Sequence, residues 1–233
     1  MEEPRVSILY EDENLIAINK PHGLLVHRSA IAKDAKEFAL QKVRDYVKQR
    51  VYLAHRLDRK TSGVLLFTKN QESNAEIQRL FREGLVIKTY HAIVRGHVIN
   101  PQTIDSPLIH EGKVKGCTTD IHPLKHYTIP ICTDRYPSSR YTLLEVRPRT
   151  GRFHQIRKHL AHIRHPIIGD RPHGCNKQNR YWKLQHNMTT MMLHARTIQL
   201  PWAKEVQHIV APYSPVFIGF ERNLCELNIY RQH

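Results

Sequence analysis

The stretch that decides the fold is the polar segment His55–Gly63, with the sequence HRLDRKTSG, together with the apolar run Val64–Thr68 that follows it. A short apolar run of this composition predicts a buried β-strand. The preceding residues, Val51–Ala54, are also apolar. We therefore expect the polar segment to be a loop held between two buried strands.

This loop carries one carboxylate, Asp58, among the cationic side chains of Arg56, Arg59 and Lys60. Opposite charges nearby favour an ionised carboxylate, and an ionised carboxylate on a fixed loop can serve as a nucleophile or a base. The alternative is a salt-bridged Asp that only orders the loop, which is the commoner situation for an arbitrary Asp in a basic protein. Thr61 and its neighbours can brace the turn by local hydrogen bonds.

Outward from the loop, hydrophobic patterns predict strands and helices in mixed order. The expected strands are Val6–Tyr10, Leu15–Lys20, Val86–Val94, Tyr141–Val146 and Met191–Leu200, and the expected helices are Lys33–Arg50, Asn70–Gly84, His154–Ile163 and Pro215–Leu227. Residues 96–136 show no clear period and are expected to form hairpins and loops. The order has no regular alternation of strand and helix, which indicates a single α+β domain over residues 1–233 with a largely antiparallel sheet flanked by helices.

The composition favours a polyanionic partner. Lys and Arg number 36 against 21 acidic residues, a formal charge of +15. A basic surface kept only for solubility is the alternative, but acidic residues serve solubility better, so nucleic acid is the favoured ligand. Charge alone distinguishes neither RNA from DNA nor an enzyme from a binding protein.

Cellular context is also constrained by the sequence. The four cysteines are scattered without a CxxC spacing, which argues against a disulfide framework or a zinc ribbon. No apolar run is long enough to cross a bilayer, and the N-terminus is acidic. We expect a soluble cytoplasmic protein with reduced thiols.

Three segments resemble the RluA-type pseudouridine synthases. HRLDRKTSG matches the HRLDxxTSG signature of that family, Lys88–Gly96 resembles its KxYxAxVxG strand, and Arg147–Asp170 resembles its third motif, built around TGRxHQIR. The resemblance implies the pseudouridine synthase catalytic fold, with Asp58 as the catalytic residue, Tyr90 against the target uracil and Arg157 paired with Asp58. A phenol suits the second role, because its face stacks on a base and its hydroxyl can take part in proton transfer.

The same motifs suggest residues that contact RNA. The resemblance implies that Arg56 fills the gap left by a flipped nucleotide or holds its phosphate. The candidate RNA-binding residues are His55, Arg56, Arg59, Thr61, Arg152, His154, Gln155 and Lys158. From spacing alone, His154, Arg157, Lys158 and His162 predict a basic face on one side of a short helix. Phe153 stands where relatives usually carry a polar residue.

Neither a metal nor a cofactor is expected. His159, His162 and His165 fall at steps of three, but Pro166 disrupts the helix there and no carboxylate or cysteine completes a ligand set nearby. Pseudouridine formation needs no redox change and no external energy. The lack of a glycine-rich phosphate-binding loop agrees with this expectation.

Within the family, the chain most resembles the TruC-type branch, which modifies uridine 65 of tRNA. The segments that carry this resemblance are Val26–Ser29, Tyr136–Tyr141, Arg164–Asp170 and His173–Arg180. It implies a tRNA substrate, no S4-like domain before Val6, and a monomer without an obligate protein partner or membrane. The alternatives are a synthase acting on ribosomal RNA, a non-catalytic RNA-binding protein on the same scaffold, and a nucleoside hydrolase or glycosylase.

Overall fold

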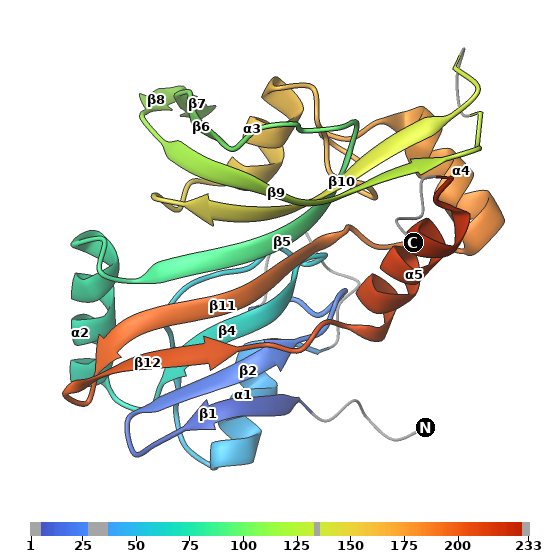
Figure 1. The fold of residues 1–233 in the computed structure, drawn as a ribbon. Helices are drawn as coiled ribbons and strands as arrows, with labels where there is room; N and C mark the ends of the chain where they lie inside the picture. Colours follow the sequence, from blue (N-terminus) through green and yellow to red (C-terminus); the bar gives the residue numbers. More distant parts are fainter. Residues whose placement is uncertain (1–5, 28–36, 133–135, 230–233) are drawn as a thin grey trace. The chain divides into compact units, whose positions relative to one another are not determined.

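The computed structural model describes residues 6–27, 37–132 and 136–229, which form two compact units (Figure 1). The first unit contains the described residues up to Lys88 together with Ala195–Ser214. The second contains Thr89–His194 and the described residues from Pro215 onward. Both units combine helices with antiparallel strand pairs, so the predicted α+β class is confirmed.

The first unit is built on strands in the order β1-β2-β4-β11, with β3 beside β4 and β12 beside β11. Their bounds are β1 Ser7–Glu11, β2 Leu15–Lys20, β3 Tyr52–Leu53, β4 Ser62–Thr68, β11 Leu193–Trp202 and β12 Glu205–Val210. All seven residues of β4 are buried, as expected for a strand covered on both faces. The loop that carries Asp58 therefore leads directly into the most buried strand of this unit.

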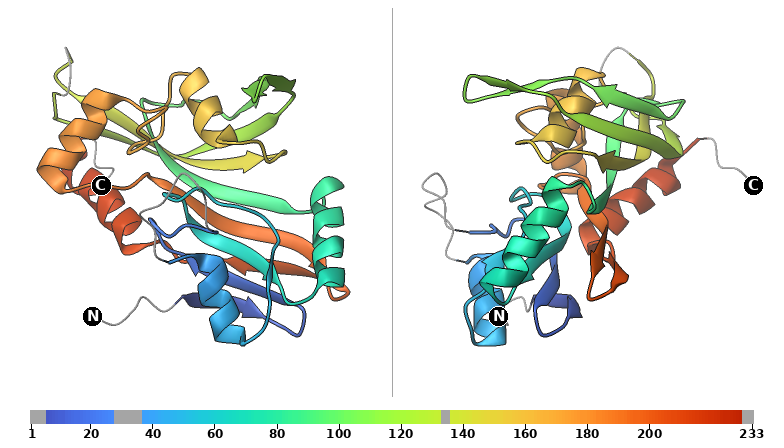
Figure 2. Two further views of the ribbon diagram at one scale, coloured as in Figure 1. Left: turned by 180° about the vertical axis from the view of Figure 1, so that it is seen from behind. Right: turned by 90° about the vertical axis from the view of Figure 1, so that its left-hand side faces the viewer.

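Two helices, α1 (Ala39–Val47) and α2 (Gln71–Arg82), lie on the same face of these strands (Figure 2). Ile77 and Leu80 of α2 are buried in one cluster with residues of β2, β4 and β11. The N-cap of α2 is Asn70, whose Oδ1 accepts a hydrogen bond from the backbone N–H of Ser73 at 2.8 Å.

Helix α1 is shorter than predicted. It begins at Ala39, and Lys48 ends it in a left-handed conformation with φ of 56°. The expected helix over Lys33–Arg50 is therefore wrong at its C-terminal end, and residues 33–36 lie outside the described part of the chain. The remaining turn, 48–50, leads the chain into β3.

The second unit is built on the strand order β5-β10-β9-β6, with β7 and β8 paired as a separate hairpin. Its strands are β5 Ile87–Arg95, β6 Gln102–Asp105, β7 Leu108–His110, β8 Lys113–Lys115, β9 Thr118–Ile129 and β10 Ser139–Pro148. Its helices are α3 Gln155–His162, α4 Asn176–His186 and α5 Pro215–Leu227. The first two residues of β5 belong to the first unit. Helix α3 contacts β10, and α5 contacts β9.

Three elements were not predicted from the sequence. Strand β9 is 12 residues long, in a region expected to hold only hairpins and loops. Helix α4 is mostly polar and buries only Gln178 and Trp182, so it lacks an apolar stripe. The edge strand β12 is also mostly exposed. Within the described ranges, we find no helix with the length and apolar character that a membrane span requires.

Candidate active site

Asp58 lies half-buried in the loop between β3 and β4. Its backbone oxygen accepts a hydrogen bond from the N–H of Thr61 at 3.0 Å, which closes a tight turn. Gly63 follows with φ of 109°, and a Cβ there would collide with the backbone oxygen of Ala195 in β11. The carboxylate is therefore presented from a turn whose end is fixed against the sheet.

Lys20, at the end of β2, is a buried cation close to Asp58. Its side chain is fully buried, and Nζ donates to the backbone oxygens of Pro21 at 2.9 Å, Leu24 at 2.9 Å and Arg59 at 3.1 Å. Burial lowers the pKa of Lys20 to about 7, and the negative charge of Asp58 acts in the opposite direction. Sequence reasoning missed this residue.

His22 braces the other end of the same turn. Its Nδ1 lies 2.7 Å from the backbone oxygen of Lys60, and its Nε2 lies 2.9 Å from Ser214 Oγ and 3.1 Å from Ser62 Oγ. Because a carbonyl oxygen only accepts, Nδ1 must donate there and Nε2 accepts from the hydroxyls. Burial lowers the pKa of His22, which favours this neutral form.

A further pair of hydrogen bonds ties the loop to the segment after β2. The N–H of Gly23 donates to the oxygen of Arg59 at 2.8 Å, and Nε of Arg59 donates to the oxygen of Gly23 at 3.1 Å. Arg59 is otherwise exposed, as is Arg56. Both of these loop cations therefore reach the solvent-exposed surface.

Two of the candidate RNA-binding residues face the protein instead. Nε2 of His55 accepts from the N–H of Leu66 at 3.2 Å, and its ring contacts Phe81 with centroids 5.6 Å apart. Burial, followed by the charge of Lys88, lowers the pKa of His55 to about 3. Thr61 is also buried. Their contacts assign both residues to supporting the loop.

Tyr90 lies in the second unit, on β5, where it pairs with Val146 of β10. It is 9% exposed, so little of the residue reaches solvent. The predicted strand around it is confirmed. Its neighbours Ala92, Ile93 and Val94 are fully buried, which makes β5 a rigid support.

Arg157 of α3 is 7% exposed and forms a two-pronged ion pair with Asp170. Nε donates to Oδ2 at 2.7 Å, and Nη2 donates to Oδ1 at 2.8 Å. These two hydrogen bonds use the edge of the planar guanidinium that carries Nε and Nη2, and Nη1 lies on another edge. Asp170 is the ion-pair partner of Arg157 within the second unit, and sequence reasoning did not assign it that role.

The predicted basic face of α3 requires a correction. Arg157 is buried by its ion pair, and His154 precedes the helix as its N-cap with φ of 55°. Lys158 is half-buried and His162 is exposed. The helical spacing of these basic residues in the sequence therefore does not produce one exposed basic stripe.

Gln155 holds the loop before α3 in place. Its Oε1 accepts from Thr150 Oγ1 at 2.7 Å and from the N–H of Arg152 at 3.0 Å. Its Nε2 donates to Thr118 O and Thr119 Oγ1, both at 3.0 Å. Gln155 is 4% exposed, so these contacts give it a supporting role rather than direct contact with RNA.

Three other candidate RNA-binding residues, Arg152, His154 and Lys158, lie in the loop before α3 or in α3 itself. Arg152 is exposed. His154 stacks on Phe153 with ring centroids 3.8 Å apart, and its Nδ1 lies 3.1 Å from Nε2 of His173. Nζ of Lys158 donates to the oxygen of Ile109 at 3.4 Å. Side chains of these types can donate hydrogen bonds to phosphate oxygens, so the three remain candidate RNA contacts.

Two of the three histidines spaced along and after α3, His159 and His165, have protein partners. His159 is fully buried, with Nδ1 2.9 Å from Thr119 Oγ1 and Nε2 2.9 Å from Ser106 O. His165 contacts the oxygen of Arg95 at 2.9 Å. Among the residues that the structure describes, no three His, Cys, Asp or Glu side chains gather in a way that could hold a metal ion.

Comparison with known proteins gives a consistent result. Residues 14–162 match the family model described as RNA pseudouridylate synthase. The chain is 39% identical over 228 residues to tRNA pseudouridine synthase C of Vibrio cholerae, covering 92% of this chain and 93% of that protein. It is 43% identical to tRNA pseudouridine synthase C of Salmonella typhi, covering 84% and 80% of the two chains.

A solved structure agrees with these sequence relatives. Human RNA Pseudouridylate Synthase Domain Containing 1 superposes with a TM-score of 0.71 at 25% identity, covering 93% of this chain and 89% of that one.

Proposed function

Because the chain belongs to the RNA pseudouridylate synthase family, we propose that it isomerises one uridine of a tRNA to pseudouridine, with Asp58 as the catalytic carboxylate and uridine 65 as the target. The observation that carries the proposal is the braced loop of Asp58, whose sequence has the family signature. The relatives of matching length named as tRNA pseudouridine synthases support the choice of tRNA.

The reaction balances without a cofactor. The bond between uracil N1 and ribose C1′ breaks, the base turns, and C5 bonds to C1′. The hydrogen of C5 leaves as a proton, and N1 takes up a proton. Asp58 would either add to C1′, remove the 2′-hydrogen to give a glycal, or add to uracil C6, and each route needs an ionised carboxylate that is held in place.

Arg157 and Tyr90 would complete the chemistry. Asp170 holds Nε and Nη2 of Arg157, and we propose that the edge carrying Nη1 orients and stabilises the Asp58 carboxylate. The ring of Tyr90 would pack on the uracil, and its hydroxyl would assist proton transfer. Tyr90 and Arg157 belong to the second unit, and Asp58 to the first.

Polar side chains of both units would bind the RNA itself. The target base must leave its stack, which costs a few kcal/mol, and Arg56 would fill the gap or hold the flipped phosphate. Arg59, Arg152, His154 and Lys158 would contact neighbouring phosphates. A tRNA substrate also favours a cytoplasmic location. We further propose that the protein works as a monomer without an obligate protein partner, which sedimentation of the free and RNA-bound protein measures.

The test is tritium release from tRNA that carries tritium at uridine C5. The synthase releases tritium without free uracil, and Asp58→Asn, which keeps the size of the side chain, should abolish release while still retaining tRNA. Free uracil would instead indicate a hydrolase or glycosylase. Retention of tRNA without tritium release by the wild type would indicate a non-catalytic binding protein.

Mapping of the product tests the position. Pseudouridine at residue 65 of the tRNA is the expected result. Modification of ribosomal RNA in place of tRNA would support the alternative substrate and overturn this choice.

A further inference from the structure

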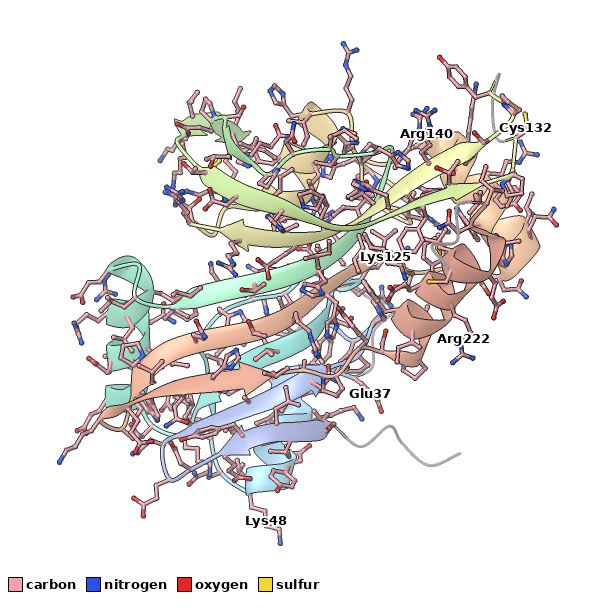
Figure 3. The ribbon with its side chains drawn as sticks, in the orientation of Figure 1. Glu37, Lys48, Lys125, Cys132, Arg140 and Arg222 are labelled. Carbon is pink, nitrogen blue, oxygen red and sulfur yellow. The ribbon has the colours of Figure 1, made fainter. Side chains whose placement is uncertain are left out.

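A groove of about 830 Å³ lies in the first unit, along α1, the turn that follows it, β3 and the start of α2. None of its lining residues belongs to the loop His55–Gly63 that carries Asp58. Figure 3 shows one lining side chain, Lys48, extending outward from the end of α1. The groove is thus a feature separate from the catalytic loop.

The charge of this groove is positive. Arg44, Lys48 and Arg50 line it, together with a single carboxylate, Asp45. Asp45 is already paired with Arg44, whose Nη2 lies 2.7 Å from Oδ1. Among the described residues, Lys48 and Arg50 have no carboxylate within ion-pair distance. The uncompensated charge suits an anionic ligand.

The rest of the lining suits a planar apolar group. Leu40, Val51 and Leu53 contribute aliphatic surface, and the guanidinium of Arg50 lies 4.9 Å from the centre of the Tyr52 ring. A guanidinium stacked on an aromatic ring presents a flat surface of the kind on which nucleobases stack. Apolar lining beside cations is therefore suited to a base with its phosphate.

One polar group in the groove also lacks a partner. Oδ1 of Asn74 is buried and accepts no hydrogen bond from any described residue. An unsatisfied buried acceptor is unfavourable, and a hydroxyl or amino group of a bound nucleotide would satisfy it after a small side-chain rotation. This observation is independent of the charge of the groove.

We propose that this groove binds an unpaired nucleotide of the RNA substrate, with the base near Tyr52 and Arg50 and the phosphate near Lys48. The inference rests on the proposed function only in taking RNA as the ligand. An acidic peptide would use the same cations, but it would not require the aromatic ring or the acceptor of Asn74. A paired RNA stem would use the cations alone, because its bases are stacked on one another.

The experiment measures binding of the full chain to a single-stranded oligouridine, a fully paired RNA hairpin and polyglutamate at several salt concentrations. Lys48→Gln and Arg50→Gln each remove one charge. Each should weaken oligouridine binding several-fold and reduce the salt dependence of log K by about 0.7 per charge. The matched control is Lys204→Gln, an exposed charge in the turn before β12, which should change both quantities much less.

The aromatic ring is tested separately. Tyr52→Leu should weaken oligouridine binding by roughly fivefold or more, whereas Tyr52→Phe, which keeps the stacking face, should bind like the wild type. Equal losses for the hairpin and for oligouridine, preferential loss of polyglutamate binding, or equal effects of Lys204→Gln would each overturn the proposal.

These outcomes are distinguishable from failure of the proposed function. The binding measurements require no turnover, so they remain valid even if no tritium is released from tRNA. If tritium is released, Arg50→Gln should raise KM for tRNA and leave kcat unchanged. A fall in kcat at saturating tRNA would contradict a site that only binds.

Discussion

The two regions that carry the proposed catalytic residues each hold a buried cation, and they hold it differently. In the first unit, the ammonium of Lys20 is surrounded by three neutral carbonyl oxygens. In the second, the guanidinium of Arg157 is matched by the full charge of Asp170. Neutral oxygens offset burial only in part, and the pKa of Lys20 falls to about 7.

This difference separates two kinds of support. A guanidinium does not lose its proton in a protein, so the buried cation of the second unit keeps its charge across neutral pH. The support of the Asp58 loop instead includes a group that titrates near neutrality. Removing one member of each support should therefore have different consequences, in size and in pH dependence.

The largest effect is expected for Asp170→Ala. The substitution leaves the buried guanidinium of Arg157 without its carboxylate, which should lower the free energy of unfolding by about 3–5 kcal/mol.

The matched control is Asp120→Ala. There Arg149 makes the same two-pronged contact, at 2.7 and 2.9 Å, but its side chain is 63% exposed. The control should lose at most about 1 kcal/mol. Equal losses in urea unfolding would show that burial of the pair is unimportant.

The next effect is expected for Lys20→Met, which removes the donor that three carbonyl oxygens share. Above its pKa, Lys20 is a neutral amine with two N–H groups, so two of these oxygens lose a hydrogen bond there. The loss should be roughly 2–4 kcal/mol near pH 9. Folded wild-type protein releases the Lys20 proton near pH 7, whereas the unfolded chain keeps it to about pH 10.4. Between these values the unfolded state binds more protons, so wild-type stability rises with pH, by up to about 1.4 kcal/mol per unit.

The variant lacks this contribution. The difference between wild type and Lys20→Met should therefore grow from about pH 7 to about pH 10 and stay constant below that window. Urea unfolding at several pH values measures it. A difference that does not change with pH would mean that Lys20 does not titrate in this range.

The sequence identified the carboxylate and the bracing of its turn by Thr61 and its neighbours, but not the buried cation that supports the loop. The loop around Asp58 could be predicted because its polar segment stands between two apolar runs, and its sequence is a family signature. The role of Lys20 could not be predicted, because Lys is almost never fully buried. Its acceptors are also backbone oxygens, which every residue type carries, so the sequence does not indicate them. One of them belongs to Arg59, 39 positions along the chain.

Asp170 shows the same limit in the second unit. It was visible as part of the third motif, but its role depends on the fold of α3 and the segment after it, which bring it to Arg157 across 13 positions. Helix α4 was missed for a different reason. Its residues are polar on nearly every side, and its one large buried apolar side chain is Trp182, whose ring centroid lies 4.6 Å from that of Phe220 in α5.

A smaller effect is expected for Gln155→Leu, which removes a neutral support. The buried amide makes four hydrogen bonds that link β9 to the loop before α3. Its loss should lower the free energy of unfolding by about 2 kcal/mol. Because no titratable group is involved, this loss should be the same at each pH used for Lys20→Met. Gln102→Leu, on an exposed strand position, should stay within about 0.5 kcal/mol of wild type.

The smallest effect is expected for Asn70→Ala, which lies outside both regions. Loss of the N-cap of α2 should cost about 1 kcal/mol, and Asn70→Asp, which keeps an acceptor for the N–H of Ser73, should recover most of it. Tritium release at 25 °C should match the wild type for both variants, because neither Asp58 nor its supports move. If Asn70→Ala slowed tritium release at 25 °C, general loss of stability in the first unit would be enough to slow turnover. The distinction between a support of the Asp58 loop and an ordinary stabilising contact would then disappear.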